Sequence, residues 1–240
     1  MTPDGWTADE MMAVAAARHL ADGEVCFVGI GLPSTAANLA RRTHAPNLVL
    51  VYESGTIGSK PGTVPLSIGD GELAETADAV VSVPEIFNYW LQPGRIDVGF
   101  LGAAEIDRRG DINTTVIGPY ERPRVRLPGA GGAPEIAASC GRVLVVVRQS
   151  TRAFVERVGF RTSLGDRVAT VITDIGVLDR DPARGGLVLT ALHPGATVEA
   201  ARAATGWDLA VAGDPAESAP PTAEELAVLR RLEATRGRAA

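Results

Sequence analysis

The chain has 240 residues, and 45% of them are hydrophobic, which is enough apolar material for a folded core and excludes an intrinsically disordered protein. Its 23 basic and 29 acidic residues give a net charge of -6, which argues against nucleic acid as the main partner because a phosphate backbone binds a basic face. Cys26 and Cys140 form neither a disulfide framework nor a CxxC metal pair, so we expect a reducing, cytoplasmic location and no metal.

The sequence gives no sign of a leader peptide, a membrane span or a phosphate-binding loop. Residues 1–5 include an early acid and no cationic stretch before an apolar run, so we expect no signal peptide. No apolar run is long enough to span a bilayer, so we expect no membrane partner. Lys60 is the only lysine, and its context, Gly58-Ser59-Lys60-Pro61-Gly62, does not fit GxxxxGK[ST].

The predicted elements begin with a helix over residues 9–20, because Thr7 and Glu10 form a capping-box pattern ahead of an alanine-rich stretch. Apolar runs then predict strands at residues 25–28, 48–52, 79–83, 96–101, 124–127, 143–147, 168–172 and 187–192. Helices are predicted between some of these strands, at residues 34–42, 84–91 and 134–139. Apolar strands that alternate with helices indicate an α/β fold with a mostly parallel sheet covered by helices on both faces.

The pattern of repeats and linkers predicts one main domain. No repeat or low-complexity block interrupts residues 7–211, so we expect residues 1–211 to form that domain. Residues 212–221 are rich in Pro, Ala and acid, which is typical of a linker, and Thr222 with Glu225 predicts the start of a final helix. Residues 212–240 are therefore expected to be a linker and a C-terminal helix that packs on the domain or on a partner.

The first of three unusual loops is Gly29-Ile30-Gly31-Leu32-Pro33, between a predicted strand and a predicted helix. Ligands of open α/β sheets bind beyond the carboxyl ends of the strands, and glycines there let the backbone approach a ligand. The plainest interpretation is a tight strand–helix turn. A dinucleotide-binding fingerprint with Glu53 as its acid is the alternative, but Ser34 replaces the third glycine, so we do not expect NAD binding.

The second loop is Glu53-Ser54-Gly55, directly after a predicted strand. An acid at a strand end is most often a solvated turn residue or a cap. A carboxylate can also act as a nucleophile, and it is ionised at neutral pH without help from a base. This second interpretation suits a chain whose histidines, His19, His44 and His193, lie in no triad context.

The third loop is Gly129-Ala130-Gly131-Gly132, just before the predicted helix at residues 134–139. Its glycines could be a flexible connector, or they could point successive N–H groups into one concavity; the abrupt helix start favours the second interpretation.

Two further segments are more simply explained by a structural role than by a functional one. Residues 87–90 include three aromatic side chains, which fit either the core or an inter-subunit surface. Residues 107–113 predict a polar hairpin turn rather than a calcium site.

Taken together and in this order, the three loops resemble those of the β-subunits of family I coenzyme A transferases. The similarity extends over residues 6–211, with support from residues 100–107 and 113–118. The resemblance implies the CoA-transferase (NagB/RpiA-like) fold and makes Glu53 the catalytic nucleophile. It further implies that CoA is bound by Gly29, Ile30, Gly31, Leu32, Pro33, Gly131 and Gly132.

The same resemblance implies a reaction and a partner. CoA is expected to pass from succinyl-CoA to 3-oxoadipate through a glutamyl-CoA thioester on Glu53, in the catabolism of aromatic compounds. An α-subunit is expected to complete the site, in an α2β2 or similar assembly. Three alternatives stay open: another acceptor such as glutaconate or acetoacetate, an acyl-CoA hydrolase in which Glu53 activates water, and a non-catalytic acyl-CoA-binding module.

Overall fold

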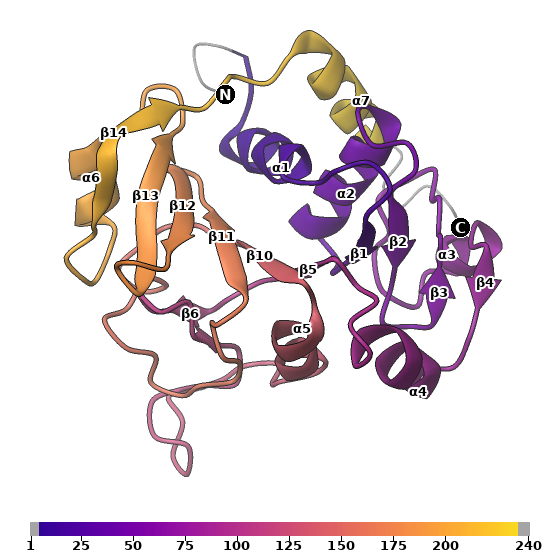
Figure 1. Cartoon of the computed structure of the whole chain (residues 1–240), viewed down its shortest axis with the longest axis horizontal. Helices are drawn as coiled ribbons and strands as arrows, with labels where there is room; N and C mark the ends of the chain where they lie inside the picture. The colour runs from indigo at the N-terminus through magenta and orange to yellow at the C-terminus, as the bar shows by residue number, and fades with distance from the viewer. Residues whose placement is uncertain (1–4, 235–240) are drawn as a thin grey trace. The chain divides into compact units, whose positions relative to one another are not determined.

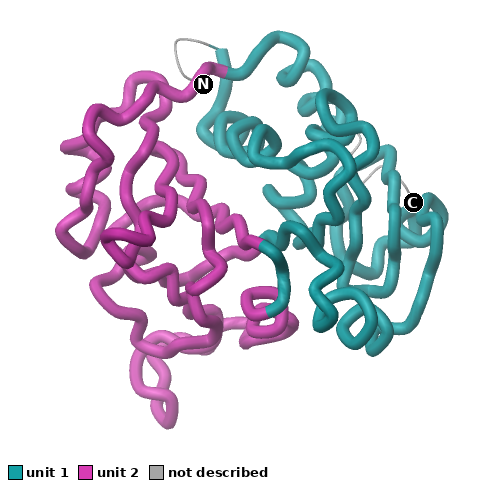
Figure 2. Tube along the Cα trace, in the orientation of Figure 1, with its two compact units in different colours: residues 1–100, 139–141, 221–240 teal, residues 101–138, 142–220 magenta. Residues whose placement is uncertain are grey.

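The computed structural model describes residues 5–234 (Figure 1), so residues 1–4, which enter the expectation about a leader peptide, lie outside the described residues. The chain forms two compact units (Figure 2). Unit 1 contains the described residues up to Phe100, residues 139–141 and the described residues from Pro221 onward; unit 2 contains Leu101–Ala138 and Arg142–Pro220. The span predicted to form one domain, residues 1–211, therefore contributes to both units.

The strands of unit 1 lie in the order β5-β1-β2-β3-β4. Their bounds are β1 (Val25–Phe27), β2 (Val49–Val51), β3 (Thr56–Ile57), β4 (Ala79–Val80) and β5 (Val98–Leu101). β1 pairs in parallel with both β2 and β5, whereas β3 and β4 are added antiparallel. The centre of this sheet is buried on both faces, which explains why its strands are continuous apolar runs rather than alternating ones.

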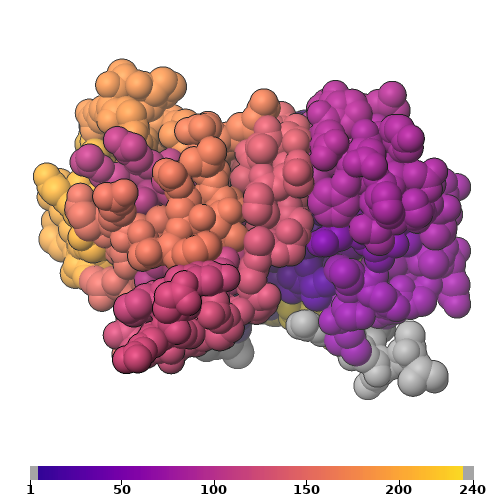
Figure 3. Space-filling model, turned by 90° about the horizontal axis from the view of Figure 1, so that it is seen from below, coloured from indigo at the N-terminus to yellow at the C-terminus, as the bar shows by residue number. Residues whose placement is uncertain are grey.

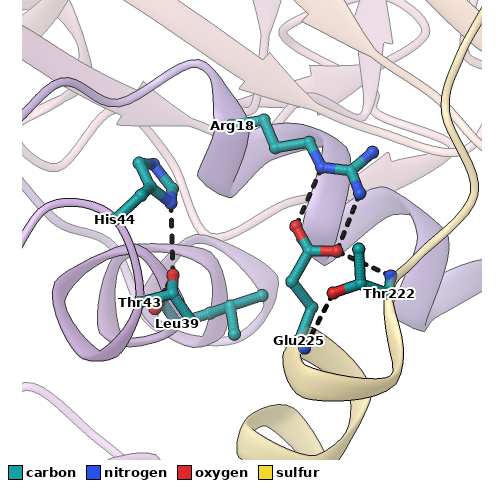
Figure 4. A network of polar contacts seen from close by, with 6 residues as sticks. All are labelled: Arg18, Leu39, Thr43, His44, Thr222 and Glu225. Carbon is teal, nitrogen blue, oxygen red and sulfur yellow. Dashed lines mark hydrogen bonds and ion pairs between the residues drawn. The ribbon is translucent and has the colours of Figure 1, made fainter.

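Three helices of unit 1 contact one another: α1 (Ala8–Arg18), α2 (Leu32–Arg42) and α7 (Ala223–Ala234). α1 begins at the predicted capping box, in which Thr7 and Glu10 bond reciprocally. Arg18 donates from Nε and Nη2 to the two carboxylate oxygens of Glu225 at 2.8 and 2.7 Å, which ties α7 to α1 (Figure 4). The predicted C-terminal helix is present, and its described residues lie against α1 and α2.

The predicted helix at residues 84–91 differs in kind from an ordinary α-helix. It is a short turn, α4 (Val83–Glu85), followed by the π-helix η1 (Ile86–Leu91); a further short helix, α3 (Gly71–Glu75), precedes it. The wider π turn places Ile86 and Leu91, five residues apart, both in the core. Of the aromatic residues here, Phe87 packs edge-on against Phe27 with ring centroids 6.3 Å apart, whereas Tyr89 is 62% exposed.

The larger sheet of unit 2 has the strand order β14-β13-β12-β11-β10. Its strands are β10 (Arg142–Val146), β11 (Val168–Ile172), β12 (Gly176–Asp181), β13 (Gly186–Leu192) and β14 (Val211–Glu217). β10 and β11 are parallel, β12 is antiparallel to both of its neighbours, and β14 is parallel to β13. The helices of this unit are α5 (Ala133–Ser139) and α6 (Val198–Ala203).

Two small hairpins complete unit 2. β6 (Glu105–Ile106) pairs with β7 (Ile112–Asn113), which confirms the hairpin turn predicted for residues 107–113. β8 (Val116–Ile117) pairs with β9 (Val125–Arg126); Val116 is buried, whereas the turn between the two strands is mostly exposed, on the face seen in Figure 3. The fold is thus α/β, with parallel strands and helices as expected, and with antiparallel pairs at β3 and β4 in unit 1 and on both sides of β12 in unit 2.

Two predicted segments differ from the structure. The linker predicted for residues 212–221 is wrong in its first part, because residues 211–217 form β14 and pair with β13 through their backbone. Pro215 lies within β14, where a missing N–H is tolerated because β14 is an edge strand. The buried strand predicted for residues 79–83 is also wrong, since only Ala79–Val80 are extended, and Val80 is 58% exposed at the other sheet edge. Among residues 5–234, no helix has the length and apolarity that a bilayer crossing requires.

Candidate active site

The parallel pairing of β1 with β2 brings two of the predicted motifs to one edge of the sheet. Phe27 is in register with Val51, and the N–H of Val28 donates to the carbonyl of Val51 at 2.9 Å. The loop Gly29-Ile30-Gly31-Leu32-Pro33 follows β1, and Glu53 follows β2, so both leave the sheet at its carboxyl edge. This is the edge at which α/β sheets bind ligands.

The central glycine of the first loop is needed for its backbone conformation, and not because a side chain there would clash with a neighbour. Gly31 has φ +87°, in the left-handed region, and a Cβ there would meet no atom within 4 Å. Gly31 is also the N-cap of α2, and its carbonyl accepts the N–H of Thr35 at 3.0 Å. The first N–H groups of α2 are left available at this edge, where helix dipoles favour anions.

Glu53 lies in a tight turn between β2 and β3. Tyr52 closes the turn at both ends, since its N–H donates to Thr56 at 3.0 Å and its carbonyl accepts from Gly55 at 3.1 Å. The Glu53 side chain is half-buried and has no hydrogen-bond or ion-pair partner among residues 5–234. A carboxylate whose oxygens are not occupied by a hydrogen-bond donor or a cation, and which solvent can reach, is free to attack an electrophile.

Tyr52, the residue before Glu53, is fully buried and joins β2 to α2. Its hydroxyl lies 3.1 Å from the Oγ of Ser34 in the first turn of α2, and Asn38 donates to the Ser34 carbonyl at 3.0 Å. Burial raises the pKa of Tyr52 to about 12, so the phenol stays protonated in the folded chain. Ser34 and Tyr52 are not among the predicted site residues, and their pairing fixes the strand end that carries Glu53 relative to the first loop.

Gly55, the last residue of the Glu53-Ser54-Gly55 motif, is required sterically. It has φ +110°, and a Cβ there would lie 2.0 Å from the Val81 carbonyl oxygen. The same approach makes a hydrogen bond from the Val81 N–H to the Gly55 carbonyl at 2.9 Å. The glycine of this motif therefore serves the turn, and Ser54, the residue before it, has a buried Oγ without a partner among the described residues.

The third loop lies in unit 2, whereas Glu53 and the first loop lie in unit 1. Gly131 is exposed with φ +48°, Gly132 is buried, and neither N–H donates a hydrogen bond within the described residues. The Gly132 carbonyl accepts the N–H of Ile136 at 3.0 Å, so α5 begins directly after the loop. Two adjacent free N–H groups are the arrangement that stabilises a developing oxyanion.

The side chains that commonly hold metals do not converge in the part of the chain that the structure describes. No group of three or more His, Cys, Asp or Glu side chains is placed to hold an ion among residues 5–234. His193 is buried, its Nε2 lies 2.9 Å from the Thr173 carbonyl, and burial lowers its pKa. His44 likewise bonds a backbone carbonyl, that of Leu20, at 3.1 Å. Both rings have structural partners.

Comparison with known proteins gives the family. A family model described as Coenzyme A transferase matches residues 9–204. One of the subunits of the 3-oxoadipate CoA-transferase of Pseudomonas knackmussii is 55% identical over 244 aligned positions, which cover 95% of this chain and 94% of that protein.

Two solved structures match over almost the whole chain. The glutaconate coenzyme A-transferase of Acidaminococcus fermentans superimposes with a TM-score of 0.88 at 28% identity, covering 97% of each chain. The decarboxylase AibA/AibB superimposes with a TM-score of 0.87 at 31% identity, again over 97% of each chain. The family match, the relative and the shared fold agree, and this chain belongs to the coenzyme A transferase family.

Proposed function

We propose that this chain is the β-subunit of a CoA-transferase that moves CoA from succinyl-CoA to 3-oxoadipate and that works with an α-subunit. The observation that carries the proposal is the 55% identity, over 95% of the chain, to one of the subunits of a 3-oxoadipate CoA-transferase. The glutaconate enzyme is more distant, at 28% identity, so 3-oxoadipate ranks ahead of glutaconate as the acceptor.

In the first half-reaction, a carboxylate oxygen of Glu53 attacks the thioester carbonyl carbon of succinyl-CoA. The C–S bond breaks and CoA leaves as a thiolate, which gives a mixed anhydride of Glu53 and succinate. The thiolate then attacks the Glu53 carbonyl carbon and expels succinate, so Glu53 holds CoA as a thioester. No net proton transfer is needed, which suits a site whose nucleophile has no histidine beside it.

In the second half-reaction, a carboxylate oxygen of the acceptor attacks the Glu53 thioester and expels CoA thiolate. The thiolate attacks the acceptor carbonyl of the new anhydride, and Glu53 leaves as a free carboxylate. Each attack builds negative charge on a carbonyl oxygen, and a single backbone or side-chain donor to such an oxygen is worth roughly 3 kcal/mol of the barrier in other enzymes. The site must also exclude water, because hydrolysis of the Glu53 thioester would waste the transferred CoA.

Steady-state kinetics of the chain assembled with its α-subunit test the proposal. Varying succinyl-CoA at several 3-oxoadipate concentrations is expected to give parallel double-reciprocal lines, because succinate leaves before the acceptor binds. Glu53→Gln is expected to lower kcat by roughly 1,000-fold or more. Glu75→Gln, an exposed acid at the end of α3, is the matched control and is expected to retain activity.

The same fold carries a decarboxylase, so the products decide the reaction. Supplying 3-oxoadipate, glutaconate, acetoacetate or no acid separates the alternatives. CoA ester formation that is fastest with 3-oxoadipate supports the proposal. Release of free CoA at the full rate without any acid would instead assign a hydrolase, and loss of carbon dioxide from a CoA ester would assign a decarboxylase.

A further inference from the structure

Unit 2 contains a hollow of about 350 Å³ beside the turn that joins β12 to β13. Its walls come from the turn of the β6–β7 hairpin, the start of β13 and the segment before β14, and none of the residues used in the proposed reaction lines it. Its size is within the range of small-molecule sites. We call it the arginine hollow, because Arg108, Arg109 and Arg184 line it.

The charges that line the arginine hollow are mostly positive. Arg108, Arg109 and Arg184 carry three positive charges, and one acid of the lining, Asp208, opposes them. A guanidinium group is always charged in a protein and presents a planar fork of N–H donors. The hollow therefore has the charge and the donors that an anion requires.

The backbone of Arg108 and Arg109 is held against β12 and β13. The carbonyl of Arg108 accepts the N–H of Leu187 at 2.8 Å, and the carbonyl of Arg109 accepts from Nη2 of Arg180 at 2.7 Å. The approach is close enough to require a glycine at the start of β13, because a Cβ on Gly186 would lie 2.8 Å from the Arg108 carbonyl oxygen. The hairpin turn that carries the two arginines therefore keeps its place beside the hollow.

The side chains of Arg108 and Arg109, in contrast, are free. Both residues are exposed, and neither guanidinium group makes a hydrogen bond or an ion pair with residues 5–234. Arg184 is held in place, since its Nη1 donates to the Val211 carbonyl at 3.2 Å and its Nε lies 3.4 Å from a carboxylate oxygen of Asp181. Two free guanidinium groups and one fixed one thus line a single hollow.

Trp207 and Leu187 give the arginine hollow an apolar wall. Trp207 is 7% exposed and stacks on Phe154, with ring centroids 5.6 Å apart and 18° between the ring planes, so its position is fixed. Its indole N–H has no hydrogen-bond partner among the described residues. A ligand with a small hydrocarbon body can pack on this wall while its charged groups meet the arginines.

Arg108 and Arg109 also line a neighbouring hollow of about 340 Å³, which suits an anion less well. Its lining has four arginines and three acids, a net charge of +1, whereas three arginines and one acid give the arginine hollow +2. One of its further arginines, Arg161, already pairs with Asp111 at 3.3 Å. An anion near the two free arginines is therefore drawn to the side of Arg184 and Trp207.

We propose that the arginine hollow binds a small organic dianion, either a phosphate monoester or a dicarboxylate. Guanidinium groups pair in bidentate fashion with both kinds of oxyanion, and two of the three arginines have no other partner among residues 5–234. The hydrocarbon part of the ligand packs on Trp207 and Leu187. The inference goes beyond the proposed function, since no bond is made or broken in the hollow.

Binding of two probes to the chain assembled with its α-subunit tests the proposal. Phenyl phosphate and phthalate have the same ring and differ in the anionic group, so they separate the two ligand classes. Isothermal titration at low salt is expected to give a Kd of about 1 mM or lower for at least one of them. The affinity is expected to fall as salt is added, because charges near the surface are screened.

Three exposed positions provide variants with different expectations. Arg109→Gln is expected to raise the Kd by about tenfold, because it removes a free guanidinium group. Asp208→Asn is expected to lower the Kd several-fold, because it removes the negative charge that repels the ligand. Arg152→Gln, which removes an exposed arginine of unit 2 outside the hollow, is the matched control and is expected to leave the Kd unchanged. A fold defect does not explain a Kd that rises in one variant and falls in another.

Both changes of Kd, against an unchanged control, are the result that supports the inference. A Kd that is the same in wild type, Arg109→Gln and Asp208→Asn would overturn it, as would an equal loss of affinity in Arg109→Gln and Arg152→Gln. Failure of both probes to bind the wild-type complex at about 10 mM would overturn it as well. CoA transfer is measured separately by the kinetics described above, so either proposal can fail while the other stands.

Discussion

The hydroxyl of Tyr52 lies 3.1 Å from the Oγ of Ser34, and both residues are buried. Tyr52 precedes Glu53 at the end of β2, and Ser34 follows Pro33 in the first turn of α2. One hydrogen bond therefore connects the two loops that carry the proposed nucleophile and the proposed CoA contact. Because the bond is buried, its loss leaves a polar group without water to replace the partner.

Tyr52→Phe is expected to lower the free energy of unfolding by about 1 kcal/mol at pH 7, through the lost bond to Ser34. The difference is expected to shrink at high pH. The pKa of Tyr52 is about 12 in the folded chain, whereas an ordinary tyrosine has a pKa near 10. Between these values the unfolded chain has lost the proton that the folded chain still holds, so the stability of the wild type falls as the pH rises through this window.

Urea unfolding at pH 7, 9, 10 and 11 measures this pH effect. Tyr89→Phe is the control, since Tyr89 is 62% exposed and its substitution is expected to change little at any of these pH values. A gap between wild type and Tyr52→Phe that is as wide at pH 11 as at pH 7 would contradict the assigned burial of the phenol.

Gly55→Ala is expected to disrupt the turn that carries Glu53. The added Cβ would lie 2.0 Å from the Val81 carbonyl oxygen, and φ is +110°. Strain of this kind costs more than about 2 kcal/mol, so we expect a lower melting temperature and a large loss of activity together. Gly71→Ala is the control, because a Cβ there meets nothing within 4 Å and the residue is the first of α3. Normal stability of Gly55→Ala would refute the close approach to Val81.

Glu10→Gln is expected to make stability less dependent on acid pH. The hydrogen bond from Arg230 at 2.6 Å holds the pKa of Glu10 below its ordinary value, with help from the N–H of Thr7. A carboxyl whose folded pKa is lowered stabilises the fold above its ordinary pKa, and this contribution disappears as the pH falls through the lowered value.

We therefore expect Glu10→Gln to be less stable than wild type by about 1 kcal/mol at pH 7, the usual worth of a helix-capping bond, and we expect this deficit to narrow as the pH falls below the ordinary pKa of a glutamate. Urea unfolding at neutral pH and at a pH below that ordinary pKa is the measurement, with Glu75→Gln as the matched control. A deficit that persists undiminished at the lower pH would show that the charge of Glu10 is not what stabilises the junction of α1 and α7.

The elements that could be predicted are those whose signals are local. The capping box of Thr7 with Glu10 and the strand at residues 168–172 are found as predicted, because a side-chain cap and an apolar run depend only on neighbouring residues. β12 is not predicted, because it ends in charged residues whose hydrogen-bond partners lie on the neighbouring strand and not next to them in the sequence. Arg180 donates to the carbonyl of Val168 at 2.7 Å, and Asp179 accepts from Thr170 at 2.7 Å.

In the candidate site, too, the features that depend on local sequence could be predicted and those that depend on distant contacts could not. Glu53 and the glycine loops could be proposed from the sequence because their residue types and order are visible in it. The bond between Ser34 and Tyr52 and the contact between Gly55 and Val81 could not, since each joins positions 18 or more residues apart that only the folded sheet brings together.

The most direct test of the account is to find where CoA is attached during the reaction. The chain, assembled with its α-subunit, is incubated with succinyl-CoA without an acceptor acid and then reduced with borohydride, which converts a carboxyl thioester to a primary alcohol. Peptide mass spectrometry is predicted to find that alcohol at Glu53, only after succinyl-CoA has been supplied, and not in Glu53→Gln. A modified residue other than Glu53, or a Glu53→Ala complex that transfers CoA at the wild-type rate, would contradict the account.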